Sequence, residues 1–342
     1  MQVNGNANLR HRNTSLLAIA ATMAPVVVTS DEIDRKLASS LKRLHLPKRL
    51  LQRVAGVHER RQWDSSMSFD EAAADAARRA IADAQIDPSE VGLLINTSVT
   101  RKHLEPSVAV GIHNSLGLPS SAMNFDITNA CLGFVNGMSL AAQLIEGGQI
   151  KYAVIVDGED ADELHVNTLE RLSGDELTKD DFIEEFASLT LGSGAAAAVL
   201  GPADLHPEGH RVLGGVTRAA TEYHDLCVGD VKGMFTDAKR LLANGMDLVM
   251  AAWEEAKSEW DWSKMDRYIT HQVSSVHTGG IIKAARLDAK RVPITYPTWG
   301  NVGPASLPMT LAAEAKNLRR GDRVLCMGVG SGLNTAMTEI VW

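Results

Sequence analysis

The stretch Asn124-Phe-Asp-Ile-Thr-Asn-Ala-Cys-Leu-Gly-Phe-Val-Asn-Gly137 carries the most information about how this chain folds. It begins with an apolar, strand-like run, passes through small polar residues and continues into a pattern with helical spacing. The helical part ends at Gly147-Gly148 and includes apolar residues that can bury one face of a helix: Phe134, Val135, Met138, Leu140, Ala141, Leu144 and Ile145. The stretch therefore predicts a strand, a turn and a buried helix, with the thiol of Cys131 at the helix N-terminus.

A similar order of strands and helices surrounds this stretch and returns in the last quarter of the chain. Short apolar runs bounded by turn residues predict buried strands at 91–98, 152–157 and 195–200, and a helical pattern runs from 106 to 116. A strand at 267–271, a helix from about 277 to 285, a loop and helix after Asn301, and a strand at 323–328 repeat that order. The repetition aligns residues 129–133 with residues 299–303 and indicates an internal duplication.

This duplication determines the expected fold class and domain boundaries. Strands that alternate with helices predict an α/β protein with mainly parallel sheets covered by helices, and with ligands at the carboxyl ends of the strands. We expect an N-terminal half over residues 14–200 and a C-terminal half over residues 210–342. The acidic, helical segment at about 160–190 is expected to be an inserted cap or an interface element. The chemistry should lie between the halves.

Composition and charge exclude several classes of function. With 342 residues and 45% apolar content the chain can bury a large core, and a net charge of −8 argues against nucleic acid or an anionic membrane as a standing partner. Three cysteines without CxxC spacing indicate neither a metal site nor a disulfide framework, and they suit the cytoplasm. No apolar run approaches the length of a membrane span.

The apolar segment at 16–28 has two interpretations. It follows two arginines and imitates a short signal peptide, but Pro25 interrupts it, and Thr29-Ser-Asp-Glu after it is typical of a helix cap. A first buried strand is the preferred interpretation.

The position of Cys131 suggests a nucleophile. A thiol at a helix N-terminus lies near unpaired N–H groups and the positive end of the helix dipole, which lower its pKa. The alternative is that Cys131 packs as a small apolar residue. The repeat favours a functional role, because it brings Asn301 to the equivalent position and His271 to the end of a neighbouring strand. Donors from His271 and Asn301 can converge on one oxygen and stabilise an enolate as an oxyanion hole does.

The segment Gly328-Val-Gly-Ser-Gly-Leu-Asn334 follows the last of these strands. It resembles a phosphate loop but lacks the Lys-Ser/Thr of a nucleotide-binding loop. Glycine allows backbone to approach a ligand closely. We therefore expect the N–H of Ser331, together with that of Cys131, to form a second oxyanion hole for an acyl carbonyl.

Taken together, these motifs resemble the thiolase superfamily from about residue 14 to Trp342, and ketoacyl-synthase III enzymes within it. The most specific strings are similar to the OleA family of bacterial long-chain olefin biosynthesis: Gly92-Leu-Leu-Ile-Asn-Thr-Ser-Val-Thr-Arg, Leu104-Glu-Pro-Ser, Val156-Asp-Gly-Glu, Gly214-Gly-Val-Thr-Arg and Glu339-Ile-Val-Trp. The resemblance implies a five-layered α-β-α-β-α fold of two duplicated halves, an obligate homodimer, an acyl-enzyme on Cys131 and no cofactor besides coenzyme A thioesters as substrates.

The OleA likeness further implies that two long-chain fatty acyl-CoA molecules condense to a 2-alkyl-3-ketoacid without decarboxylation. Such a reaction needs a base for an α-proton, and the resemblance assigns this role to Glu105, reaching the partner subunit's site. An acid before Pro106 also suits an ordinary helix start. Arg60 and Arg61 are weak candidates for coenzyme A phosphates, and a carrier-protein donor stays open.

Two other functions remain in view. One is a decarboxylative ketoacyl-synthase III that uses malonyl-carrier protein, since Cys131, His271 and Asn301 serve both reactions. The other is an inactive homologue that acts as a scaffold. Downstream enzymes of an olefin pathway are possible partners under the first interpretation.

Overall fold

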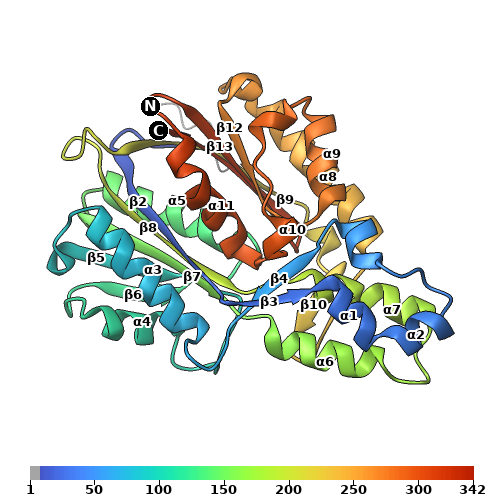
Figure 1. Cartoon of the computed structure of the whole chain (residues 1–342). Coiled ribbons are helices and arrows are strands. Elements are labelled where there is room, and N and C mark those ends of the chain that lie inside the picture. Colours follow the sequence, from blue (N-terminus) through green and yellow to red (C-terminus); the bar gives the residue numbers. More distant parts are fainter. Residues whose placement is uncertain (1–7) are drawn as a thin grey trace.

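The computed structural model describes residues 8–342, and its centre is a ten-stranded sheet (Figure 1). The strands are β1 (Asn8–Arg10), β2 (Thr14–Met23), β5 (Val91–Asn96), β6 (Met123–Asp126), β7 (Tyr152–Glu159), β8 (Gly194–Pro202), β9 (His210–Ala219), β12 (Arg267–Thr270), β13 (Arg323–Gly330) and β14 (Asn334–Val341). Their order is β12-β13-β14-β9-β2-β8-β7-β5-β6, and β1 pairs with β9. β2 and β9 meet only at Ser15 and Leu16, so this short pairing joins two halves.

Both halves follow the same plan, which confirms the predicted duplication. From the junction outward, one half places β2, β8, β7 and β5, while the other places β9, β14, β13 and β12. In each half the first strand lies innermost and the last strand pairs beside it. β6 extends only the N-terminal half of the described sheet. Residues 16–23 of the first apolar segment lie within β2, as the preferred interpretation expects. The expected single buried strand is wrong for the rest of the segment, because Pro25 separates β2 from β3 (Val26–Thr29), in which Val26 and Val27 are exposed.

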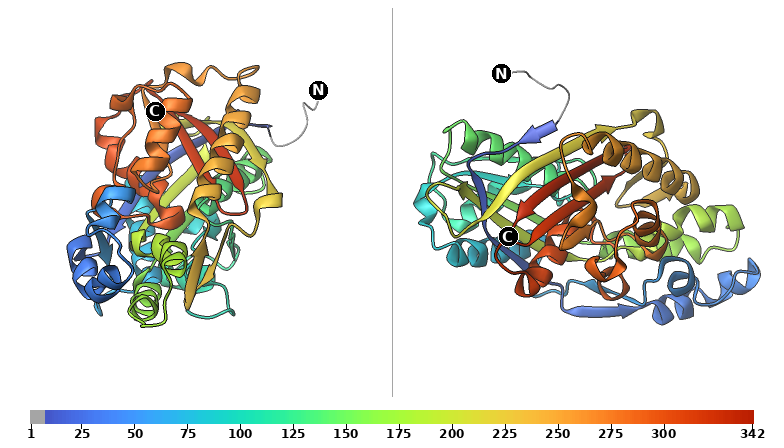
Figure 2. Two further views of the ribbon diagram at one scale, coloured as in Figure 1. Left: turned by 90° about the vertical axis from the view of Figure 1, so that its right-hand side faces the viewer. Right: turned by 90° about the horizontal axis from the view of Figure 1, so that it is seen from above.

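Helices cover both halves and also fill the space between them, giving five layers (Figure 2). The helices of these layers are α3 (Phe69–Asp83) and α4 (Val108–Leu116), then α5 (Gly133–Glu146) and α11 (Ser306–Glu314), then α8 (Ala238–Ala256) and α9 (Ser275–Ala284). Residues of α5 and α11 share one buried core with strands from both halves. The predicted α/β fold with a five-layered architecture is therefore confirmed, and the helix that follows Cys131 lies in its middle layer.

Strand β7 shows how the layers use the two-residue period of a strand. Val154 and Val156 pack in the core of α3, whereas Ala153 and Ile155 pack in the core of α5. Successive side chains of a strand point to opposite faces, so a strand between two helical layers must be apolar on both. Continuous burial from Tyr152 to Glu159 follows from this position.

The prediction of mainly parallel sheets is wrong. Among the strands of residues 8–342, parallel pairing occurs only in β12–β13, β5–β6 and β5–β7, while the pairs that join β2, β8, β9 and β14 to their neighbours are antiparallel. β14 follows β13 after residues 331–333 alone, and a connection this short forces the chain to reverse direction. The alternation of strands and helices in the sequence indicates helical crossovers. Such crossovers account for the parallel pairs, but they do not predict the direction of strands joined by short turns.

A smaller subdomain projects from one end of the sheet, at the lower right of Figure 1. Its elements are β3 (Val26–Thr29), α1 (Ser30–Lys36), α2 (Ala38–Arg43), η1 (Leu51–Ala55), β4 (Glu59–Gln62), α6 (Asp162–Leu172), α7 (Lys179–Glu185), η3 (Phe186–Thr190), β10 (Cys227–Asp230) and β11 (Gly233–Thr236). Ile33 of α1 and Leu41 of α2 share a separate core with Leu172, Phe182 and Leu189 of the inserted segment. Thr29 and Glu32 form a capping box at the start of α1, as the sequence predicted.

The remaining short helices connect the larger elements. They are η2 (Pro88–Glu90), η4 (Thr221–Tyr223), η5 (Trp262–Lys264), η6 (Ala289–Arg291), α10 (Tyr296–Trp299), η7 (Gly303–Ala305) and η8 (Ala315–Asn317). Across residues 8–342, no helix has both the length and the apolar character that crossing a bilayer requires.

Gly158 tests the contact between β7 and α3. A Cβ added there would lie 2.2 Å from the carbonyl oxygen of Phe69, so one of the two elements has to move. We expect Gly158→Ala to lower the free energy of unfolding by about 2 kcal/mol. Gly111, in α4, has no atom within 4 Å of an added Cβ, and Gly111→Ala should raise stability by up to about 1 kcal/mol. Urea unfolding measures the free energy of unfolding of both variants. Equal changes in Gly158→Ala and Gly111→Ala would contradict the packing argument.

Candidate active site

Cys131 lies on the turn between β6 and α5, just before the helix begins. Leu132 is the N-cap and Gly133 the first helical residue, so the thiol stands one residue outside the cap. Ala130 adopts a positive φ of 44°, which is uncommon for a residue with a side chain. A Cβ on Gly133 would come within 2.8 Å of the Thr97 carbonyl oxygen. The start of α5 is therefore pressed against the chain that leaves β5.

The turn around Cys131 is also tied to the other half of the protein. Asn129 donates to Asn136 in α5 at 2.7 Å and accepts a hydrogen bond from Asn334 at 3.2 Å. A Cβ on Gly330 would lie 3.3 Å from the backbone nitrogen of Cys131. The glycine-rich turn that contains Ser331 thus lies beside the Cys131 turn, where the sequence expects the second oxyanion hole.

Electrostatics at Cys131 differ from the expectation. Burial raises the pKa of the Cys131 thiol far above its usual value, and the nearby Cys227, Glu159 and Asp157 raise it further. The expected lowering of this pKa by the helix terminus is not what the structure gives, because desolvation of the thiolate dominates in an enclosed site. The thiol is protonated at neutral pH, so its attack must be coupled to loss of the proton.

His271 follows directly after β12 and is buried. Its backbone N–H donates to Met327 on β13 at 2.9 Å. Gly328, the next residue of β13, lies against the side chain of Leu132, so His271 is one strand away from the neighbour of Cys131. Burial, together with His277, lowers the pKa of His271 to about 3. The imidazole is therefore neutral at pH 7, and a neutral imidazole can donate one N–H to an oxyanion.

Asn301 is held by its backbone and by one side-chain atom. Its N–H donates to Thr190, and its carbonyl accepts from Gly192. Its side-chain Oδ1 accepts the N–H of Gly303 at 3.1 Å, and this identifies Nδ2 as the donor end of the amide. η7, which begins at Gly303, contacts both α5 and β7. The Asn301 turn thus meets the layer that carries Cys131, as the aligned repeat predicted.

Gln272, which the sequence reasoning missed, links His271 to the Asn301 region. It is fully buried, donates to the Pro293 carbonyl at 3.2 Å and accepts from Thr295 N–H at 2.8 Å. A polar residue next to His271 at a predicted strand end was the available signal, but Pro293 and Thr295 are more than 20 residues away in the chain. Gln272 fixes the strand end relative to the segment that leads into α10.

Two buried carboxyl groups at the end of β7 were also missed. Asp157 accepts a hydrogen bond from Thr97 Oγ1 at 2.5 Å, and Glu159 accepts from the N–H groups of Val99 and Thr100. Burial raises the pKa of Glu159 to about 7 and, with the adjacent Glu159, raises that of Asp157 well above its usual range. Val156-Asp-Gly-Glu entered the sequence reasoning only as a family string. Two acids two residues apart on a buried strand were the overlooked physical signal.

Glu105 occupies the loop between β5 and α4 and is exposed. Its neighbour Leu104 is 97% exposed, which is unusual for a large apolar side chain. Within one chain, therefore, Glu105 does not have the apolar surroundings that the resemblance implies for a base. A role in catalysis requires a second subunit to cover this loop.

The two arginines proposed for coenzyme A differ in their surroundings. Arg60 is fully buried and donates to the Val28 carbonyl and to Ser30, so its guanidinium has no surface to offer a phosphate. Arg61 is half-buried and forms an ion pair with Glu59 at 3.4 Å. Arg60 joins β3, β4 and α1, and of the pair only Arg61 is accessible for a ligand contact.

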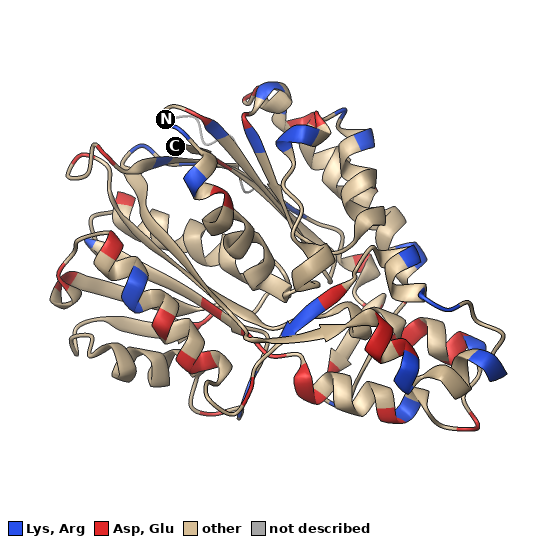
Figure 3. Ribbon diagram, viewed as in Figure 1, with Lys and Arg blue, Asp and Glu red and all other residues tan. Residues whose placement is uncertain are grey.

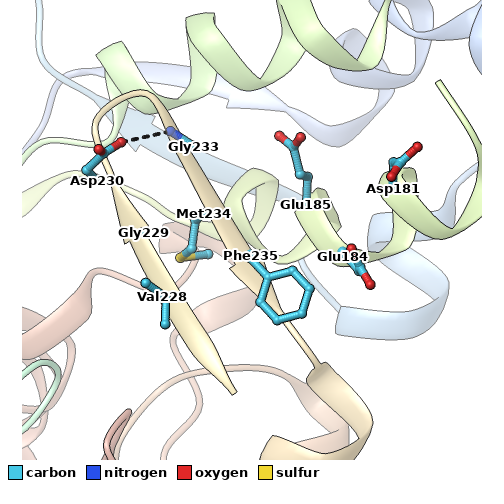
Figure 4. A pocket seen from close by; sticks show the side chains of 9 residues that line it. All are labelled: Asp181, Glu184, Glu185, Val228, Gly229, Asp230, Gly233, Met234 and Phe235. Carbon is cyan, nitrogen blue, oxygen red and sulfur yellow. Dashed lines mark hydrogen bonds between the residues drawn. The ribbon is translucent and has the colours of Figure 1, made fainter. Parts of the chain in front are cut away.

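A surface pocket of about 450 Å³ lies in the projecting subdomain, away from these residues. Figure 4 shows Val228, Met234 and Phe235 of the β10–β11 hairpin opposite acidic side chains of α7, among them Glu184. Charged residues are dense on this subdomain, whereas the central α5 carries few, as Figure 3 shows. The environment around Cys131 is accordingly apolar apart from the residues described above.

A duplicated five-layered fold with a cysteine at the central helix, and with a histidine and an asparagine from the other half, defines a condensing enzyme of the thiolase type. Residues 125–220 match the family model described as 3-oxoacyl-[acyl-carrier-protein] synthase III, and residues 256–342 match its C-terminal model. The chain belongs to the OleA family of acyl-CoA:acyl-CoA alkyltransferases within this superfamily.

Relatives with this name match along their whole length. The acyl-CoA:acyl-CoA alkyltransferase of Xanthomonas campestris is 43% identical, with 97% of this chain and 99% of the relative covered. That of Shewanella oneidensis is 33% identical, with 98% and 100% covered. A crystal structure of a Xanthomonas campestris OleA variant with bound lauric acid and lauroyl-CoA superposes with a TM-score of 0.94 at 42% identity, covering 97% of this chain and 99% of that one.

A β-ketoacyl-[acyl-carrier-protein] synthase III from Desulfitobacterium hafniense is less similar. It is 27% identical, with 84% of this chain and 87% of the relative covered.

The buried state of His271 predicts a pH dependence of stability. Its folded-state pKa of about 3 lies below the unfolded value of 6.5, so the unfolded chain binds the proton first and stability falls as the pH decreases. Between pH 7 and pH 5, His271→Asn should lose less stability than the wild type, by about 2 kcal/mol. Urea unfolding at the two pH values measures this. The exposed His224→Asn serves as control. If the free energy of unfolding of His271→Asn changed with pH as steeply as that of the wild type, the low pKa of His271 would be contradicted.

Proposed function

We propose that this protein catalyses the non-decarboxylative Claisen condensation of two long-chain fatty acyl-CoA molecules to a 2-alkyl-3-ketoacid. The carrying observation is the full-length match, at 43% identity, to an acyl-CoA:acyl-CoA alkyltransferase. Support also comes from the arrangement of Cys131, His271 and Asn301 around the start of α5. Solved structures of Xanthomonas campestris OleA include substitutions of a cysteine, a histidine and a glutamate, which are the residue types assigned here.

In the first half-reaction, Cys131 takes an acyl group from acyl-CoA. Its sulfur bonds to the thioester carbonyl carbon, the carbon–sulfur bond to coenzyme A breaks, and coenzyme A leaves as the thiol with the proton from Cys131. The N–H groups of Cys131 and Ser331 stabilise the negative oxygen of the intermediate. Since burial keeps the Cys131 thiol protonated, bond formation and proton transfer proceed together.

In the second half-reaction, a second acyl-CoA places its thioester oxygen toward His271 and Asn301. Glu105 removes the α-proton, and the enolate carbon bonds to the acyl carbon on Cys131, whose sulfur then leaves. Neutral His271 and the Nδ2 of Asn301 are both donors, as enolate stabilisation requires. Hydrolysis of the remaining thioester gives the ketoacid and coenzyme A.

A homodimer completes this site in our proposal. Glu105 and Leu104 are exposed on one loop, and a partner subunit that covers this loop would desolvate the carboxylate and bury the leucine. Burial makes a carboxylate a stronger base because it raises its pKa. Glu105 then serves the Cys131 of the partner rather than that of its own chain.

The proposal also includes the setting of the reaction. Coenzyme A thioesters are the substrates, no further cofactor takes part, and Arg61 contacts a phosphate of coenzyme A. The free thiols of Cys131, Cys227 and Cys326 suit the reducing cytoplasm. The ketoacid product would pass to downstream enzymes of olefin formation.

The decarboxylative synthase is the second candidate, because the synthase III models match both halves. It obtains its carbanion from malonyl-carrier protein and needs no Glu105. The higher identity to the alkyltransferases than to the synthase of Desulfitobacterium hafniense favours the first function.

Incubation with lauroyl-CoA tests the nucleophile. We expect a lauroyl adduct on the Cys131 peptide by mass spectrometry, together with release of coenzyme A. Cys326→Ala, which removes a different buried thiol, should keep the adduct, and Cys131→Ala should abolish it. An adduct that persists in Cys131→Ala would show that Cys131 is not the nucleophile.

Glu105→Gln separates the two reaction types and the two subunits. Because amide nitrogen cannot accept the α-proton, the variant should form the acyl adduct but make ketoacid at least about 100-fold more slowly. The exposed Glu163→Gln is the control.

A purified hybrid of one Cys131→Ala subunit and one Glu105→Gln subunit should regain condensation, since one site then holds both groups. A hybrid as inactive as Glu105→Gln would refute action across the dimer.

A further inference from the structure

The loop that carries Glu105 is held at both ends by carboxylates. It leaves β5 at Thr97 and enters α4 at Val108. At its start, Glu159 accepts hydrogen bonds from Val99 N–H at 2.6 Å, from Thr100 N–H at 3.2 Å and from Thr100 Oγ1 at 2.5 Å. At its end, Asp126 accepts from the N–H groups of Val108 and Ala109, each at 3.0 Å.

A cation joins the two anchors. Arg101, inside the loop, forms an ion pair with Asp126 at 2.9 Å, and its charge also acts on Glu159. β5, β6 and β7 are neighbours in the sheet (Figure 1), so the two anchors stand at the ends of the strands on either side of the strand that starts the loop. The loop's two ends are thus fixed to the rigid sheet.

Glu159 also lies next to the turn that holds Asn301, one of the residues assigned to the oxyanion site. A Cβ on Gly303 would lie 3.6 Å from its side chain, and Gly303 is the residue that holds Oδ1 of Asn301. The backbone carbonyl of Glu159 accepts a hydrogen bond from Trp63 Nε1 at 2.9 Å, and 93% of the surface of Glu159 is buried. One side chain therefore contacts both the base-bearing loop and the Asn301 turn.

We propose that Glu159 and Asp126 are positioning residues for the carbon–carbon bond-forming step, because they fix the loop from which Glu105 reaches the reacting carbon. This inference rests on the proposed function and extends it. Neither carboxylate acts on substrate. The oxygens of each carboxylate accept hydrogen bonds from backbone N–H groups at one end of the loop, and these bonds hold the loop in place.

The interaction has a specific chemical requirement. All the loop groups at Glu159 can serve as donors, so the anchor must present two acceptor oxygens. In Glu159→Gln one oxygen becomes an NH₂ group, which faces N–H donors and cannot accept from them. The same holds for Asp126→Asn at the other end. Loss of a donor alone, in Thr100→Val, leaves the two backbone contacts intact and should have a smaller effect.

The experiment compares the two half-reactions in these variants, with lauroyl-CoA as the only substrate. We expect Glu159→Gln and Asp126→Asn to form ketoacid about 10- to 100-fold more slowly, since misplacement by about 1 Å costs this much, and to change the rate of Cys131 acylation by a much smaller factor. The exposed Glu170→Gln should match the wild type in both steps. Intact acylation also shows that the variants are folded.

Hydrogen exchange supplies a readout that does not depend on activity. Amides of residues 99–109 should exchange faster in both variants, while those of α5 keep their wild-type rates. Wild-type condensation by both variants, or slowing of acylation and condensation by the same factor, would overturn the inference. If the wild type itself makes no ketoacid from acyl-CoA alone, the proposed function fails, and faster exchange confined to 99–109 still supports the anchoring.

Discussion

Everything in the candidate site depends on the close packing of the α5 start between the two halves of the protein. Gly133 lies against the Thr97 carbonyl oxygen of one half, while Gly330 of the other half lies against the backbone nitrogen of Cys131. A side chain at either glycine would separate these segments, so the approach sets where the thiol stands. Because most residues of α5 near its start are buried in the middle layer, its terminus cannot move without disturbing a shared core.

Electrostatics follow from this enclosure. The same burial that holds the thiol raises the pKa of Cys131 and lowers that of His271 to about 3, so the resting site is a neutral thiol beside a neutral imidazole. The neutral imidazole suits enolate stabilisation, whereas the thiol must lose its proton as it attacks. Asp157 and Glu159 are further titratable groups nearby, and their hydrogen bonds connect the Cys131 region to the loop of Glu105.

Duplication explains why a nucleophile and a donor can meet at one place. The Cys131 turn and the Asn301 turn occupy equivalent positions in two similar halves, and each leads into one helix of the middle layer. The halves then diverged in their connections. The N-terminal half carries β6 and most elements of the projecting subdomain, including α6 and α7, while β10 and β11 come from the C-terminal half. The loop proposed to reach a second subunit also belongs to the N-terminal half.

The sequence by itself determined the repeat, the helix after Cys131 and several strands of both halves, because apolar periodicity and glycine placement are local properties. It indicated Cys131, His271 and Asn301 as candidates for the site on the same grounds, but it did not indicate β9, α3 or α8. Tertiary structure alone decided the antiparallel pairing of β8 and β14, since strand direction depends on where a connection returns. It also decided that Arg60 is buried, that the Cys131 pKa rises, and that Gln272 and Glu159 are anchors. These are consequences of contacts and desolvation between residues far apart in the chain, which no local pattern encodes.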